Sequence, residues 1–330
     1  MSATVPLKLL AALALLGLAA TLSVTVGTRN VPLGDVWAAL AGRADTIGTA
    51  AVAVRLPRTA LALLAGGALG LAGAIMQGFT RNPLADPGIL GVNAGAALFV
   101  AIGIAWFGIS GAAAYLWIGV AGAGCAGILV FAIASIGRDG ATPLKLTLAG
   151  TATTISASAF VIAIILPRND IAGTVQAWSV GGVGGASFDT LLPALPFLGV
   201  GLLLSFASAR VLNALALGDE QATGLGQNVV TGRILAGVAA VVLSGTATAL
   251  CGPIGFVGLI VPHLCRILGG TDHRVLLPAS ALGGAILLAL SDVLGRVVAR
   301  PNELDVGVVT AFVGAPFFIW TVRRQRIRGL

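Results

Sequence analysis

The chain has 330 residues, of which 57% are hydrophobic and only 9% are charged, and its formal net charge is +7. A soluble domain carries roughly 25% charged residues, so this composition excludes one and indicates a polytopic membrane protein. The sequence has no basic face interleaved with aromatic residues, which argues against nucleic acid as a partner. The basic stretch at 323–328 is instead suited to anionic lipid headgroups.

Apolar windows of about the length that spans a bilayer follow one another along the chain. There are ten, at residues 9–27, 59–79, 88–108, 115–136, 146–167, 191–209, 234–251, 254–264, 275–295 and 306–322. Residues 234–265 are too long for one helix of roughly 20 residues, so we expect a break at Cys251-Gly252-Pro253. The glycines of GGALGLAGA at 66–74 permit close helix packing. We therefore predict an all-α fold with about ten transmembrane helices in a single domain over residues 1–330.

The distribution of basic residues predicts the orientation. With both chain ends in the cytoplasm, twelve of the nineteen Lys and Arg residues lie inside and seven outside, as the positive-inside rule favours. Windows two to five then enter the membrane from outside and windows seven to ten from inside, so the two halves have inverted topology. We expect a multi-pass protein of the cell membrane with both termini cytoplasmic.

On the outer side, three arginines lie at the ends of predicted spans. Arg55 and Arg58 precede the second window, and Arg296 ends the ninth. Any one of them could extend toward lipid headgroups. Three arginines on the side where positive charge is disfavoured indicate instead a docking surface for an acidic partner.

Hydroxyl side chains form a stripe on the fifth window. Thr147, Thr151, Thr154 and Ser158 follow steps of four, three and four, so they share one helix face. The stripe could line a solute pathway. Hydrogen bonds from these hydroxyls to their own helix or to a neighbouring helix are an equally open alternative.

The inner interval 210–233 contains a short acidic segment, LGDEQATGLG, at 217–226. It is too polar to cross a bilayer and too short to be a domain. We predict an amphipathic helix there. Such a helix between membrane spans offers a surface to a soluble partner.

The sequence offers little chemistry inside the membrane. It contains no GxxxxGK[ST] loop and no HExxH motif. The only acidic residue within the windows is Asp292, so the buried relays of a proton-coupled carrier are nearly absent. Asp292 precedes Arg296 by four residues, and a local helical ion pair is favoured over a coupling-ion site. We expect no catalytic residue and no metal site, and we expect the chain not to be an enzyme.

Seven sequence blocks carry a resemblance to a known family. They are RLPR (55–58), RNPLADPGILGVNAGA (81–96), LGDEQATGLG (217–226), GFVGLIVPHLCR (255–266), TDHR (271–274), SDVLGR (291–296) and GAPFF (314–318). In this order they resemble the permease subunits of ABC importers for iron-siderophores, haem and cobalamin, the FecCD family. The resemblance covers nearly the whole chain. It implies the type II ABC importer permease fold.

The resemblance also implies partners. These are a second permease subunit, identical or paralogous, a pair of cytoplasmic ATPase subunits and an external solute-binding protein. ATP and Mg would bind to the partner ATPase, with no cofactor on this chain. Transport would proceed by alternating access.

The resemblance implies roles for particular residues. The ATPase-coupling helix would comprise Leu217, Gly218, Asp219, Glu220, Ala222, Leu225 and Gly226. Arg55, Arg58 and Arg296 correspond to the basic residues that meet glutamates of the binding protein. Asn82 and Leu84 resemble cytoplasmic gate residues, and Thr142 and Pro143 resemble a second gate constriction. One departure is Asp305, which stands where the family usually has a proline.

Three alternatives concern the function. Residues 141–150 and 292–304 look most like ferric-siderophore permeases, while haem and cobalamin remain alternative substrates. A secondary transporter that works without ATP is an alternative of another class, and it predicts transport by the isolated chain. An intramembrane enzyme would need an arrangement of paired acids, of Ser and His, or of metal ligands, and the windows contain no such arrangement.

Overall fold

The computed structural model describes residues 4–43, 45–137 and 142–328, in which every regular element is helical. The longer helices are α1 (Thr4–Thr25), α3 (Ile47–Thr80), α4 (Val92–Phe107), α5 (Ala112–Ala134), α6 (Pro143–Ile165), α7 (Asn169–Val180), α9 (Leu195–Leu215), α11 (Val229–Cys251), α12 (Val257–Gly269), α13 (His273–Val298) and α14 (Val306–Arg328). The shorter ones are α2 (Leu33–Leu40), η1 (Pro87–Leu90), α8 (Phe188–Leu191), η2 (Leu192–Ala194) and α10 (Asp219–Gly224). The predicted all-α class is confirmed.

The ten predicted windows each coincide with a helical segment. Seven helical segments in the described ranges are long and apolar enough to cross a bilayer, and α4, α12 and the apolar part of α14 are shorter apolar helices that account for the other three windows. The predicted break is also present, because α11 ends at Cys251 and α12 begins at Val257. Gly252 has a φ of +71°, and a Cβ there would lie 2.1 Å from the carbonyl oxygen of Trp178. The chain can turn there only because Gly252 lacks a side chain.

The second predicted window starts twelve residues too late. Helix α3 begins at Ile47 rather than at residue 59, and Thr46 caps it by accepting the backbone N–H of Thr49 at 3.1 Å. An apolar window measures the hydrocarbon layer, whereas a helix with a good cap continues beyond it. Arg55 and Arg58 therefore lie on a helix and not in a loop before it.

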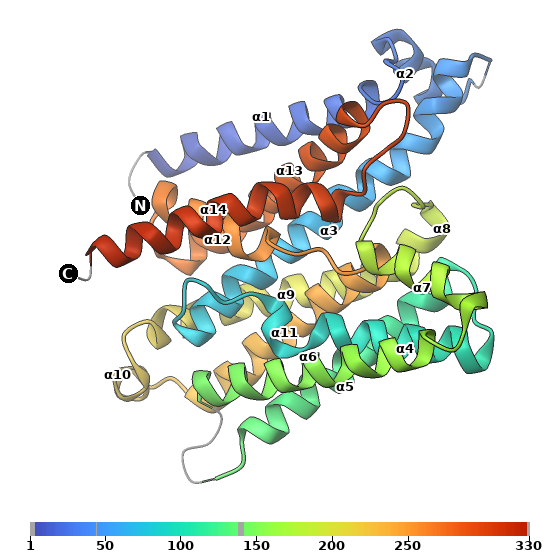
Figure 1. Cartoon of the computed structure of the whole chain (residues 1–330). Coiled ribbons are helices and arrows are strands. Elements are labelled where there is room, and N and C mark those ends of the chain that lie inside the picture. The colour runs from blue at the N-terminus through green and yellow to red at the C-terminus, as the bar shows by residue number, and fades with distance from the viewer. Residues whose placement is uncertain (1–3, 44, 138–141, 329–330) are drawn as a thin grey trace.

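The first helix begins and the last helix ends on the same side of the molecule. Figure 1 shows that α1 begins and α14 ends on the same side as α10, while α2, α7 and α8 lie at the opposite side. An even number of crossings requires this arrangement. The short helices α2 and α10 thus lie on opposite sides of the bundle.

Helix α3 is the centre of the packing. It contacts α13, α11, α12, α9 and α1, and 78% of its most apolar stretch is buried, against 17% for α6. Figure 1 shows α3 between the α1, α13 and α14 group and the α4, α5 and α6 group. Helix α6 therefore leaves most of its surface for lipid or another subunit.

Glycines let the backbones of α3 and its neighbours touch. A Cβ on Gly66 would lie 2.3 Å from the carbonyl oxygen of Gly284, and a Cβ on Gly284 would lie 2.1 Å from that of Gly66. A Cβ on Gly73 would lie 1.9 Å from the carbonyl oxygen of Gly258. In a bilayer, where apolar side chains gain little by leaving lipid, such close approach is a main source of helix association.

We predict that Gly284→Ala separates α3 from α13 and lowers the free energy of unfolding by about 1–3 kcal/mol, as overpacking does. Thermal unfolding of the purified protein in detergent measures this. Gly237→Ala on α11 is the matched control, since a Cβ there meets nothing within 4 Å. Equal destabilisation by both substitutions would contradict the packing argument.

Candidate coupling, docking and pathway sites

The predicted coupling segment contains a helix. Helix α10 follows Gly218, whose φ of +115° suits glycine, and Gly226 with a φ of +75° ends the segment. Ala222 is completely buried and packs against the Ala214 and Leu215 end of α9. One apolar contact thus fixes the helix against the bundle.

The opposite surface of this segment faces outward. Glu220 is exposed, and the side chains of Leu217 and Leu225, on either side of α10, are 63% and 62% exposed. Exposed leucines beside an acidic residue form a small amphipathic surface. Such a surface is better suited to contact with a protein partner than to exposure to water.

A single carboxylate connects this helix to two others. Asp219 forms ion pairs with Arg81 at 3.1 Å and with Arg233 at 2.8 Å. Arg81 is the residue that caps α3, with a φ of +52°, and Arg233 lies one turn into α11. The coupling segment is therefore joined to α11, which follows it in the chain, and to the central helix, whose Arg81 lies far from Asp219 in the sequence.

The predicted gate residues lie at the starts and ends of helices. Asn82 and Leu84 directly follow Arg81, and the Oδ1 atom of Asn82 accepts the backbone N–H of Leu84 at 2.9 Å. Thr142 caps α6 by accepting the backbone N–H of Lys145 at 3.3 Å. Pro143 begins α6, and its side chain lies outside the described part of the chain. The first gate segment thus adjoins the Asp219 cluster, and the gating role of all four residues stays a prediction.

The hydroxyl stripe lies on the poorly covered helix α6. Thr151 and Ser158 are exposed, and Thr147 and Thr154 are half-buried. The hydroxyl of Thr151 donates to the carbonyl oxygen of Thr147 at 2.8 Å, which is the back-bonding that the alternative interpretation expects. An exposed stripe is also what a pathway between two subunits requires, so pathway lining stays a prediction.

On the opposite side of the bundle, Asp292 holds two arginines. Arg58 donates to both Asp292 oxygens at 2.8–3.2 Å, and Arg296 pairs with the same carboxylate at 2.9 Å. The Asp292–Arg296 pair expected from the spacing is thus present, and Arg58 of α3 joins it. Asp292 is completely buried and Arg296 is 1% exposed. The removal of one partner from such a pair leaves an uncompensated buried charge.

Glu303 completes this cluster. Its Oε2 atom lies 2.6 Å from Nη1 of Arg58, and its side chain is 38% exposed, on the loop between α13 and α14. Two guanidinium groups, those of Arg58 and Arg296, thereby meet two carboxylates. Glu303 was missed at the level of sequence, because nothing in its local pattern points to Arg58.

The three predicted docking arginines therefore differ. Arg55 is buried and donates to the carbonyl oxygens of Val24, Thr25 and Arg29 at 2.7–3.3 Å. Arg296 donates to Ser23 as well as to Asp292. Both tie α1 to the bundle. Only Arg58 also holds an exposed acidic side chain, and a docking role for the three stays a prediction.

Among the described residues, no group of three or more His, Cys, Asp or Glu side chains is placed to hold a metal ion. Cys125, Cys251 and Cys265 are free cysteines. The features that remain are a polar helix on one side, an arginine and carboxylate cluster on the other, and a hydroxyl-bearing helix between them.

Comparison with known proteins decides the family, because the family model of the FecCD transport family matches residues 15–324. The chain belongs to the FecCD transport family. It is 42% identical over 318 residues to the ferric enterobactin transport system permease protein FepD of Escherichia coli, with 95% of this chain and 94% of FepD covered. It is 40% identical over 276 residues to the hemin transport system permease protein HmuU of Yersinia pestis, with 83% of each chain covered.

Comparison with solved structures agrees with this family. A solved metal-chelate type ABC transporter in an inward-facing conformation matches with a TM-score of 0.84 and 28% identity, over 97% of this chain and 99% of that one. Permeases named for ferric citrate and cobalamin import also match this FecCD-family chain. The chain is thus a multi-pass permease subunit of an ABC importer, and both the recognised family and the importer permease fold are confirmed.

The ion pairs of Asp219 generate a prediction. Asp219→Asn should reduce the protection of the α10 amides against hydrogen exchange by up to about fivefold, the value of a partly exposed ion pair. Glu220→Gln is the matched control, because Glu220 neighbours Asp219 and forms no ion pair among the described residues. If protection fell equally in both variants, loss of charge alone would explain the effect.

Proposed function

We propose that this permease imports a ferric-siderophore complex, driven by cytoplasmic ATPase subunits that bind at α10. The observation that carries the proposal is the position of α10. It is a polar helix that is anchored through Ala222, presents exposed leucines and is tied by Asp219 to α3 and α11. On this proposal the α10 side is cytoplasmic, as the distribution of basic residues predicts.

The same contacts supply a path for coupling. When an ATPase moves α10, the ion pairs of Asp219 carry the displacement to Arg81 and so to the adjoining segment with Asn82 and Leu84. ATPase closure then favours one permease conformation over the other by differential binding, and no bond is made on this chain. This accounts for an importer whose spans contain almost no ionisable relay.

At the outer side, a solute-binding protein would dock through its acidic residues at Arg58. The Nη1 atom of Arg58 is held by Glu303, which is partly exposed, while Asp292 holds the Nε and Nη2 side. A carboxylate of the binding protein would replace Glu303 without disturbing the buried pair. Arg55 and Arg296 would support this surface from within.

The substrate follows from the relatives and not from the site. FepD is named for ferric enterobactin, and a further relative is an iron(3+)-hydroxamate permease, FhuB of Bacillus subtilis. HmuU, at 40% identity, keeps haem as a second candidate, and cobalamin is a third. The hydroxyl stripe on α6 would face the pathway in each case.

Reconstitution tests the proposal. We expect ATP-dependent uptake of ferric-siderophore by proteoliposomes that contain the permease with its ATPase, when the substrate is presented on the binding protein. Uptake of haem or cobalamin instead would keep the importer and overturn the substrate. Uptake without ATP and without a binding protein would show a secondary transporter.

The proposed docking at Arg58 leads to a separate prediction. Glu303→Gln should tighten binding of the solute-binding protein about two- to fivefold, because a competing partner of Arg58 is removed. Surface plasmon resonance on permease in nanodiscs measures this. The matched control is Asp170→Asn on α7. It removes one exposed carboxylate, which pairs with Arg168, from the side of the bundle opposite α10. If the control tightened binding equally, net charge and not Arg58 would be responsible.

A further inference from the structure

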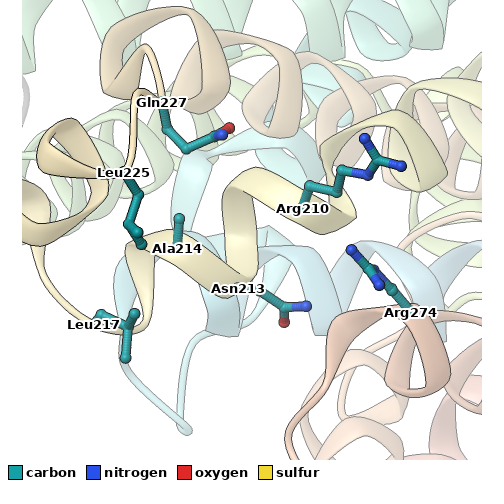
Figure 2. A pocket seen from close by; sticks show the side chains of 7 residues that line it. All are labelled: Arg210, Asn213, Ala214, Leu217, Leu225, Gln227 and Arg274. Atoms are coloured by element: carbon teal, nitrogen blue, oxygen red, sulfur yellow. The ribbon is translucent and has the colours of Figure 1, made fainter. Parts of the chain in front are cut away.

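A cavity of about 320 Å³ lies on the α10 side of the bundle, between the end of α9, the coupling segment and the start of α13. Figure 2 shows Arg210 and Arg274 at one end of it, Leu217 and Leu225 at the other, and Asn213 between them. Two of these side chains are cations that come from different transmembrane helices. The cavity is therefore both positively charged and apolar.

Neither cation has a direct partner in the described part of the chain. Among the described residues, the side chains of Arg210 and Arg274 form no ion pair and no hydrogen bond. The nearby Asp272 serves as a helix cap. Its carboxylate accepts the backbone N–H of Arg274 at 2.9 Å and the Nδ2 of Asn213 at 2.7 Å, and these bonds hold its pKa below the usual range. Asp272 also interacts electrostatically with Arg274 without pairing with its side chain. Two guanidinium groups that lack an ion-pair partner at one cavity are complementary to an anion.

The positions of the two arginines along their helices indicate the kind of anion. Arg210 lies five residues before the end of α9, and Arg274 lies in the first turn of α13, so both stand at the ends of membrane-spanning segments. Leu203 and Phe206 precede Arg210 by seven and four residues on the same face of α9. Their side chains are 71% and 43% exposed. Arg210, at the end of a membrane-spanning segment, is thus followed along α9 by an exposed apolar stripe.

We propose that this cavity binds an anionic phospholipid. The phosphodiester group would lie between Arg210 and Arg274, and an acyl chain would follow Leu203 and Phe206 along α9. A basic pocket between transmembrane helices is suited to an anionic headgroup. The site would fasten α9 to α13 beside the coupling segment, whichever substrate the permease carries.

An acidic segment of the ATPase is the competing occupant, since Leu217 and Leu225 adjoin α10. The lipid is favoured because the helix face that carries Arg210 continues, away from α10, into the exposed apolar side chains of Leu203 and Phe206. An ATPase that approaches from the aqueous side would meet Leu217 and Leu225 first.

Native mass spectrometry of the purified permease, titrated with phosphatidylglycerol or phosphatidylcholine, tests the proposal. We expect one tightly retained phosphatidylglycerol per chain and no comparable retention of phosphatidylcholine. Arg210→Gln and Arg274→Gln should each weaken phosphatidylglycerol binding about fivefold, the effect of one arginine near a membrane surface. Arg210→Lys, which keeps the charge, should restore most of the binding.

Arg323→Gln is the control for general attraction to anionic headgroups, because Arg323 is exposed in the basic stretch 323–328, near the end of α14 and on the same side of the bundle. If this control weakened binding as much as Arg210→Gln, the attraction would be general and the site would be overturned. Unchanged lipid binding in Arg210→Gln and Arg274→Gln, with loss of ATPase assembly, would assign the cavity to the ATPase. Thermal unfolding shows that the variants are folded, and since neither arginine is paired, we expect no loss of stability.

Discussion

The close backbone contact between α3 and its neighbours is the constraint on which the rest of the structure depends. Gly66 and Gly284 let α3 touch α13, and Gly73 lets it touch α12 at Gly258. In a bilayer this contact replaces the hydrophobic driving force of a soluble core. Because α3 carries Arg58 toward one end and is capped by Arg81 at the other, the same packing fixes both charged clusters.

The buried charges of the outer cluster are matched by partners. Asp292 pairs with Arg58 and Arg296, and Arg55 donates to backbone carbonyls at the end of α1 and just beyond it. An unmatched charge in that environment would cost several kcal/mol, at least about 2.5 kcal/mol even on the mildest scales. The clusters therefore hold helices together as well as presenting charge, and of the three predicted docking arginines Arg58 alone pairs with an exposed carboxylate.

The sequence predicted the elements better than it predicted their contacts. The ten windows, the break after Cys251 and the helix at 219–224 all follow from local hydropathy and turn chemistry. The start of α3 was missed because helix caps extend beyond the apolar layer. The partners of Asp219 and Glu303 could not be predicted, since Arg81 and Arg58 lie more than a hundred residues away from them and only packing brings them together.

The sharing of Asp219 by two arginines has a consequence for motion. Arg81 and Arg233 stand at the ends of α3 and α11, two helices that pack against each other, and one carboxylate serves as counter-ion to both. Withdrawal of α10 would leave two like charges facing each other, so both helix ends would lose their attraction in the same step. Asp219 is thus the single carboxylate on which the attraction between the two helix ends depends. The partial exposure of Arg81 to water weakens this electrostatic attraction.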